Sequence, residues 1–306
     1  MPSSSPESRR FRFGLILDSH DATRDGVVEL AHRAEASGIA VLLGTDHLGR
    51  WATLPLLQSA AEATSLRIGT FVLNNDLRHP TVLAQELATI DAITNGRLEI
   101  GIGAGWNRQE YVAAGLPFDA PGERVTRMQA TVAMLKQALS DGRIDHEADT
   151  AYPAIHQSGL PTSVQRPHPP IMIGGGGPRM LRYAAREADI IGIDPRAGDP
   201  NDITEAAVDR KFAWIREAAG DRWAQLEINI ALFELDPDYH TRSGPPPPRA
   251  RGISDAEMSR SPHYLVGDAS EMIDTLLERR DRWGISYIAL RPEHLGALIR
   301  ILSVLA

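Results

Sequence analysis

The chain has 306 residues, of which 42% are hydrophobic and 24% charged, the composition of an ordinary globular protein. Its 40 acidic residues outnumber its 32 basic ones, and this acidic balance argues against general nucleic-acid binding. Cysteine is absent, which excludes disulfides, thiolate metal sites and cysteine nucleophiles. No run of about 18 apolar residues occurs, so we expect no membrane-spanning helix.

The first ten residues lack the apolar stretch of a secretory signal, and we expect a disordered tail at 1–10. The absence of cysteine agrees with a reducing compartment, and we expect a cytoplasmic protein. No His-x-His or His-Glu-x-x-His spacing occurs, so we expect no metal site.

Short apolar runs alternate with amphipathic segments along the rest of the chain. In chain order, the apolar runs predict strands at 11–17, 39–43, 66–73, 98–102, 171–173, 190–193, 226–232 and 287–290. The amphipathic segments predict helices at 25–37, 53–64, 81–93, 124–139, from 178, at 202–219, at 270–283 and from the last strand to 305.

The predicted strands are continuous Val, Ile and Leu runs, which is typical of parallel strands buried on both faces. About eight strand–helix units fit a (β/α)8 barrel, whereas a doubly wound sheet would leave units over. We therefore expect one barrel domain over 11–306. Two segments, at about 144–168 and 236–264, do not fit the repeat and are expected to be inserted loops that shape substrate specificity.

Active sites of such barrels lie at the carboxyl ends of the strands, so the residues after each apolar run are the candidates. The longest glycine run, Gly174, Gly175, Gly176 and Gly177, leads from a strand into a helix and could hold a phosphate. The turn Gly103, Ala104 and Gly105 would let a flat ring approach the backbone. Neither has the G-x-G-x-x-G spacing of a Rossmann fold.

His47 follows Asp46 at the end of the second strand and is a candidate general acid or base; a structural histidine is the alternative. Trp106 follows the fourth strand and is a candidate wall of the site. Arg291 follows the last strand and could pair with a carboxylate or phosphate. Asp18 follows the first strand and is a further candidate for substrate contact. We expect His79, just before Pro80, to shape the start of the next helix.

Two stretches carry longer motifs. Between Gly69 and Phe118 the chain reads RHP, then LAQELATID, then TNGRLEIGIGAGW, and between Pro170 and Asp189 it reads PIMIGGGG followed by AAREAD. This combination resembles the luciferase-like monooxygenase superfamily, whose members are (β/α)8 barrels that bind FMN or the deazaflavin coenzyme F420. The stretch from Thr45 to Trp51 is similar to the F420-dependent branch.

The resemblance implies a cofactor site. It places His47 and Trp51 at the C5 face of the deazaflavin. Asp46, Asn74 and the two glycine turns become cofactor-binding candidates. It also implies a non-proline cis peptide bond, which by position joins Phe71 to Val72, behind the ring. A homodimer is a further expectation.

One residue departs from the family pattern. The sugar-phosphate and alcohol dehydrogenases of the F420 branch carry glutamate as the fourth residue of the turn after strand four, and Trp106 stands there in this chain. We therefore expect an F420-dependent oxidoreductase, a reductase in direction, that transfers hydride between F420 and a small organic C=C, C=N or C=O group, with His47 as proton donor or acceptor.

Three alternatives remain open at the level of the sequence. The first is an FMN-dependent monooxygenase that uses O2 and reduced flavin on the same fold. The second is a non-catalytic flavin-binding subunit, and the third is a metal-free lyase or hydrolase barrel.

Overall fold

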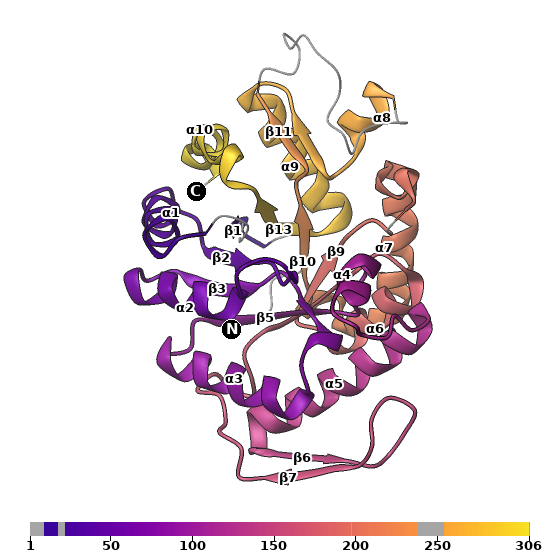
Figure 1. Cartoon of the computed structure of the whole chain (residues 1–306). Coiled ribbons are helices and arrows are strands. Elements are labelled where there is room, and N and C mark those ends of the chain that lie inside the picture. Colours follow the sequence, from indigo (N-terminus) through magenta and orange to yellow (C-terminus); the bar gives the residue numbers. More distant parts are fainter. Residues whose placement is uncertain (1–8, 18–21, 197, 238–253, 306) are drawn as a thin grey trace. The chain divides into compact units, whose positions relative to one another are not determined.

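The structure is a computed structural model that describes residues 9–17, 22–196, 198–237 and 254–305 (Figure 1). In the main sheet, β3 and β4 count as one interrupted strand, which gives eight strands with helices between them. The fold class is the (β/α)8 barrel, which confirms the prediction. The chain divides into two compact units, a central unit (18–32 and 42–172) and a terminal unit (1–17, 33–41 and 173–306). Each is described by itself, and the single-domain assignment stays a prediction.

The central unit contains the first strand–helix repeats and the first insertion. Its elements are α2 (Thr53–Ala63), β3 (Arg67–Thr70), β4 (Leu73–Asn74), the 3-10 turn η2 (Asn75–Leu77), α3 (Pro80–Ile93), β5 (Leu98–Gly103), α4 (Arg108–Ala113), α5 (Pro121–Asp141), β6 (Arg143–His146) and β7 (Ile155–Ser158). Three elements cross between the units, namely α1 (Arg24–Ala36), β2 (Val41–Gly44) and β8 (Ile171–Gly175). Within the unit, β3 and β4 both pair with β5 in parallel.

The terminal unit contains β1 (Arg12–Leu17), α6 (Pro178–Glu187), β9 (Ile190–Ile193), η3 (Pro200–Ile203), α7 (Glu205–Ala219), η4 (Gly220–Gln225), β10 (Glu227–Ala231), β11 (Glu234–Asp236), α8 (Asp255–Arg260), β12 (Tyr264–Val266), α9 (Ala269–Trp283), β13 (Ile285–Leu290), η6 (Pro292–His294) and α10 (Leu295–Leu305). Here β13 pairs in parallel with β1 and β10, and β10 also pairs with β9. The strands are buried along most of their lengths, as their continuous apolar sequences predict.

Helix boundaries follow local chemistry. Pro80 is the first residue of α3, and the His79 ring nitrogen Nδ1 accepts a hydrogen bond from the Thr81 N–H, which confirms the expectation for His79. The predicted helix from Asp202 begins instead at Glu205. Thr204 is the N-cap and accepts a hydrogen bond from the Ala207 N–H, while Asp202 lies in the preceding 3-10 turn.

The first inserted segment is more ordered than the predicted loop. It contains an antiparallel hairpin in which β6 pairs with β7 (Figure 1). Its far end is held by the buried Asp91 carboxylate, which accepts hydrogen bonds from the N–H groups of Val164 and Gln165 at 2.8 and 3.0 Å and from the Gln165 amide at 2.7 Å. Both ends are also joined directly, because the Ser163 N–H donates to the Leu139 carbonyl. Hydrogen bonds therefore hold both ends of the inserted segment in place.

The second inserted segment is described only at its flanks, where β11 and β12 form a separate parallel pair and α8 precedes β12. Its residues 238–253, like most of the predicted tail at 1–10, lie outside the described residues. Arg9, the first residue described, donates from its guanidinium to the carbonyls of Ala224 and Gln225. Among the described residues, no helix combines the length and apolarity needed to cross a membrane.

The terminal unit buries one of the two lysines of the chain. Lys211 is fully buried and its Nζ lies 2.8 Å from an oxygen of the Asp202 carboxylate. The same ammonium donates to the carbonyls of Asp194 and Asp202. Burial alone would raise the pKa of Asp202, but hydrogen bonds from Arg196 and Lys211 outweigh it, and the net pKa lies below its ordinary value. Asp202 is therefore charged at neutral pH.

We predict that Lys211→Met lowers the free energy of unfolding by about 3–5 kcal/mol, because the buried Asp202 carboxylate loses its cation. Urea unfolding followed by circular dichroism measures the change. The matched control is Lys136→Met, which removes the other lysine, partly exposed on α5, and should cost about 1 kcal/mol or less. Equal effects of the two substitutions would contradict a structural role for the buried pair.

Candidate active site

Asp46 follows β2 and joins it to the segment after β4. Its carboxylate is buried and receives two hydrogen bonds from the Arg78 guanidinium, at 2.7 and 3.1 Å. The backbone N–H of Asn74 donates to the same carboxylate at 3.0 Å. Two-pronged pairing of this kind fixes orientation as well as charge. Asp46 thus holds the β4 segment against the end of β2.

A bulge separates β3 from β4. Gly69 is opposite Glu99 and Leu73 is opposite Ile102, so four steps along the interrupted strand match three steps along β5. The peptide bond between Phe71 and Val72, inside this bulge, is cis. The resemblance implied this cis bond, and the expectation is confirmed.

The bulge rests on a close approach of backbones. The Thr70 hydroxyl donates to the Gly101 carbonyl and accepts from the Gly101 N–H, both at 2.8 Å. A Cβ atom on Gly101 would collide with the Thr70 carbonyl oxygen. The Phe71 N–H donates to the Gly44 carbonyl at the end of β2, at 2.7 Å. Glycine at 101 is therefore a steric requirement of the bulge.

His47 lies beside a carboxylate that the sequence analysis did not identify. Its Nδ1 is 2.6 Å from Oε1 of Glu110, in the first turn of α4, and the Asn107 side chain donates to the same oxygen at 2.6 Å. The Glu110 side chain is only 10% exposed. A carboxylate on Nδ1 orients the ring and leaves Nε2 for proton exchange with another group.

Two indole rings of the central unit are exposed. Trp106 meets the His47 ring edge-on, with centroids 6.1 Å apart, and is 63% exposed. Trp51 is 61% exposed. Large exposed aromatic surfaces of this kind mark binding sites more often than scattered small apolar groups do. The Thr45 hydroxyl, just before Asp46, is buried without a hydrogen-bond partner in the described part of the chain.

The turn after β5 is fixed from behind by a buried arginine. The Arg124 guanidinium donates to the carbonyls of Ala104 and Gly105 at 3.2 and 3.3 Å. Gly105 has φ of +73°, and a Cβ atom there would collide with the Tyr111 hydroxyl. The turn from Gly103 to Gly105 is thus a rigid element.

Tyr111 connects this turn to the bulge. Its hydroxyl donates to Oδ1 of Asn74 at 2.9 Å and to Oδ2 of Asp76 at 3.0 Å. Burial, followed by the nearby Asp76 carboxylate, raises the pKa of Tyr111 to about 12. The hydroxyl therefore remains a donor at physiological pH, and it keeps Asn74 in place.

The four-glycine run belongs to the terminal unit. Gly174 and Gly175 end β8, and Gly177 is the N-cap of α6, where a Cβ atom would meet nothing within 4 Å. A Cβ atom on Gly176 would collide with the Asp194 carbonyl, the oxygen to which Lys211 donates. Because Gly177 has no side chain, it does not cap the N–H groups in the first turn of α6. Binding of a phosphate by these N–H groups, as predicted from the sequence, requires that no side chain occupy them.

The remaining candidates are distributed between the units. Among the described residues of the central unit, Asn74 donates to Asp46 and lies against Gly105, and His47 meets the ring of Trp106. Arg291 lies in the terminal unit, where it is exposed at the start of η6. Asp18 lies outside the described residues. Their roles stay predictions.

Glu110 had a signal in the sequence. The spacing Asn107-x-x-Glu110 is that of a capping box, which predicts a helix from 108 with the glutamate in its first turn. The structure has that helix, α4, and Asn107 is its N-cap. If this helix is not predicted, the residues after Trp106 are interpreted as a loop, and Glu110 is not identified as the partner of His47.

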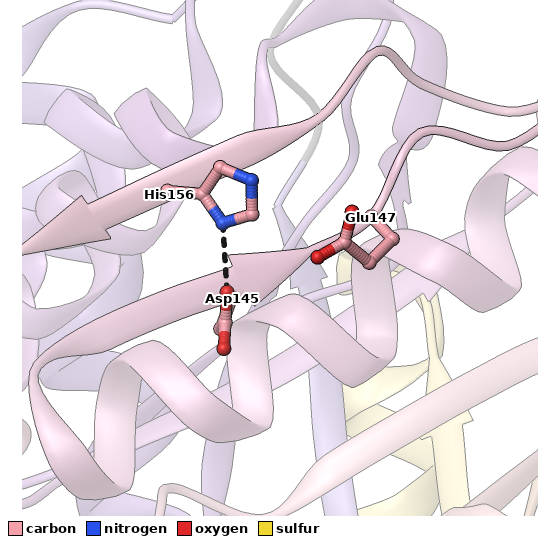
Figure 2. A group of neighbouring side chains, drawn as sticks. All are labelled: Asp145, Glu147 and His156. Carbon is pink, nitrogen blue, oxygen red and sulfur yellow. Dashed lines mark hydrogen bonds and ion pairs between the residues drawn. The ribbon is translucent and has the colours of Figure 1, made fainter.

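Three residues on the hairpin have side chains of the kinds that bind metals, although they do not form either of the histidine spacings considered in the sequence. Ligand atoms of Asp145, Glu147 and His156 lie within 4.8 Å of one another, on exposed positions (Figure 2). Asp145 and His156 are paired across β6 and β7, and their side chains are 2.7 Å apart. This cross-strand pair accounts for the grouping, and the expected absence of a metal stays a prediction.

The sequence is similar to those of several known oxidoreductases. One of them is the F420-dependent glucose-6-phosphate dehydrogenase of Kineococcus radiotolerans, which is 29% identical over 224 residues, 69% of this chain and 65% of that protein. The 5,10-methylenetetrahydromethanopterin reductase of Methanopyrus kandleri is 29% identical over 242 residues, 74% of this chain and 66% of that protein. The chain thus spans slightly less than two thirds of the length of these relatives.

The solved structure of a coenzyme F420-dependent tetrahydromethanopterin reductase from Methanopyrus kandleri has the same fold. It covers 97% of this chain and 98% of its own at 20% identity, with a TM-score of 0.75. The sequence profile described as luciferase-like monooxygenase matches residues 11–233. Because that match covers well over half of the chain, the protein belongs to the luciferase-like monooxygenase family.

Proposed function

We propose that the protein is a coenzyme F420-dependent oxidoreductase, acting as a reductase, that transfers hydride between the deazaflavin and a small organic C=C, C=N or C=O group. The observation that carries the proposal is the pair of His47 and Glu110, 2.6 Å apart beside Trp106. Relatives whose names specify F420, the F420-dependent glucose-6-phosphate dehydrogenases, add support for this coenzyme over FMN. The homodimer and the cytoplasmic location stay predictions.

The residues of the central unit fit a flat heterocycle. The Thr45 hydroxyl is buried and unpartnered, so a polar ring edge would satisfy it. The exposed indoles of Trp51 and Trp106 offer ring faces for stacking. When bound, F420 supplies the hydride-carrying carbon. Thr45, Trp51 and the bulge at Phe71–Val72 are the residues of the central unit that would hold its ring. The phosphate role of the turn at Gly177, in the terminal unit, stays a prediction.

The proposed role of His47 is proton exchange at Nε2. Glu110 accepts from the Nδ1–H and keeps the imidazole in one tautomer and one orientation. Asn107 donates to the same Glu110 oxygen and prevents the carboxylate from turning away. Glu110 is therefore a positioning residue, and His47 is the proposed catalytic residue.

Trp106 supports an apolar substrate class. The resemblance implies that it stands where F420-dependent sugar-phosphate and alcohol dehydrogenases have glutamate, and its indole is 63% exposed. An open apolar ring beside His47 favours an unsaturated organic substrate over a sugar phosphate, which would need charged or hydrogen-bonding partners.

The cofactor assignment predicts that F420 quenches the tryptophan fluorescence and binds at least about tenfold more tightly than FMN. Thr45→Val removes only the unpartnered hydroxyl and should weaken F420 binding about tenfold, the effect of one lost hydrogen bond. Thr126→Val, on the exposed side of α5, is the control and should leave the affinity unchanged. Tighter binding of FMN would favour the monooxygenase alternative.

The catalytic assignment predicts that His47→Ala lowers kcat by about 10²–10⁴-fold, with F420 still bound. Glu110→Gln should lower kcat about tenfold, because the imidazole loses the carboxylate that orients it. Stopped-flow oxidation of reduced F420 with an enone or imine substrate measures both. Glu62→Gln, exposed on α2, is the control. Full hydride transfer by His47→Ala would contradict the assignment.

A further inference from the structure

A cavity lies in the central unit, and neither His47 nor Glu110 is among the residues that line it. Its volume is about 330 Å3, and it is lined by residues of η2, the end of α4, the loop that follows α4, and α5. Tyr152, from the turn between β6 and β7, completes the lining. None of the roles proposed above uses this space.

Tyr152 is held firmly in the lining. Its hydroxyl is 2.9 Å from the Thr131 hydroxyl on α5. Its ring meets the rings of His79 and His146 edge-on, with centroids 6.4 and 6.2 Å apart. The inserted hairpin therefore supplies a fixed wall of the cavity.

Asn75 provides an unsatisfied acceptor. It is only 1% exposed, and its amide nitrogen donates to Asp76 at 3.2 Å and to the Tyr152 hydroxyl at 3.4 Å. Its Oδ1 has no hydrogen-bond partner among the residues described. A buried acceptor without a partner costs about 1–3 kcal/mol, so a donor on a ligand would be favoured there.

Arg127 provides the complementary donor. Its Nε and Nη2 bind the carboxylates of Asp76 and Asp119, while no bond from its Nη1 is found within the described chain. Arg78, the other cation of the lining, is paired with Asp46. Four carboxylates, those of Asp46, Glu86, Asp76 and Asp119, thus neutralise two guanidinium groups, and an anionic ligand gains no net attraction.

The rest of the lining is apolar or aromatic. Leu77, Leu116 and Pro117 contribute to it, together with the rings of Tyr111 and Tyr152. A volume of about 330 Å3 is at the small end of the range for ligand pockets, and it suits a one- or two-ring compound.

We propose that this cavity is a second small-molecule site, which binds a neutral planar lactam. The ligand N–H donates to Oδ1 of Asn75, and the adjacent ligand carbonyl accepts from Nη1 of Arg127. The site is separate from the proposed coenzyme site and does not depend on the assignment of F420. Through Asp76 and Tyr111, its occupant touches the residues that hold Asn74 at the bulge.

The test titrates the purified full chain, without coenzyme, with 2-quinolone by isothermal calorimetry. We expect saturable one-to-one binding at concentrations on the order of 1 mM or below. N-methyl-2-quinolone, which lacks the N–H, should bind at least about tenfold more weakly. Asn75→Leu should cause a similar loss for 2-quinolone, whereas His156→Ala, elsewhere on the hairpin, should cause none. The comparison of the two quinolones on the unmodified protein needs no variant to fold.

A saturating amount of F420 should not displace 2-quinolone, and Trp51→Ala should not change its affinity. Displacement by F420 would assign the probe to the coenzyme site and overturn the proposal, while leaving the proposed function intact. Equal affinities of the two quinolones, or no binding of either, would also overturn it. Tighter binding of inorganic phosphate than of 2-quinolone would contradict the neutral character of the cavity.

Discussion

The central unit depends on one buried charge. The Asp46 carboxylate is removed from water, and an unpaired ion in that position would cost several kcal/mol. The Arg78 guanidinium and the Asn74 N–H satisfy it together, so the end of β2 and the segment from β4 to Arg78 must meet at one point. The segment after the bulge can then take only one position relative to β2.

Further ion pairs and hydrogen bonds connect Asp46 to other residues of the central unit. Arg78 pairs with Asp46, Tyr111 bridges Asn74 and Asp76, and Arg127 binds Asp76. The network runs from the end of β2 to α5, and each link both satisfies a buried polar group and fixes its neighbour. Asp46 and Asn74, two of the proposed coenzyme-binding residues, belong to this network, as do four residues that line the cavity. Residues that stabilise the unit therefore also position some of its proposed functional groups.

Most of the fold and part of the candidate site could be predicted from the sequence. The features that could not be predicted have physical explanations. The strands, most helices and the barrel class followed from continuous apolar runs, because both faces of such strands are buried. The position of the cis bond at Phe71–Val72 followed only from the family resemblance, since no local propensity marks it. Glu110 was missed because α4 has only six residues, too short for an apolar period. The pairing of Asn75 with Tyr152 joins residues 77 positions apart, beyond any local pattern.

The hydrogen bonds that the Asp91 carboxylate accepts from Val164 and Gln165, called here the Asp91 clamp, have an evolutionary consequence. The base of the hairpin is secured by backbone donors of Val164 and Gln165, and nothing in that clamp depends on the composition of the excursion it closes. Longer or shorter excursions change loop-closure entropy only slowly with length. Descendants of this chain could therefore exchange the hairpin and its tip as a cassette, acquiring a new wall opposite Asn75 while the sheet beneath stays the same.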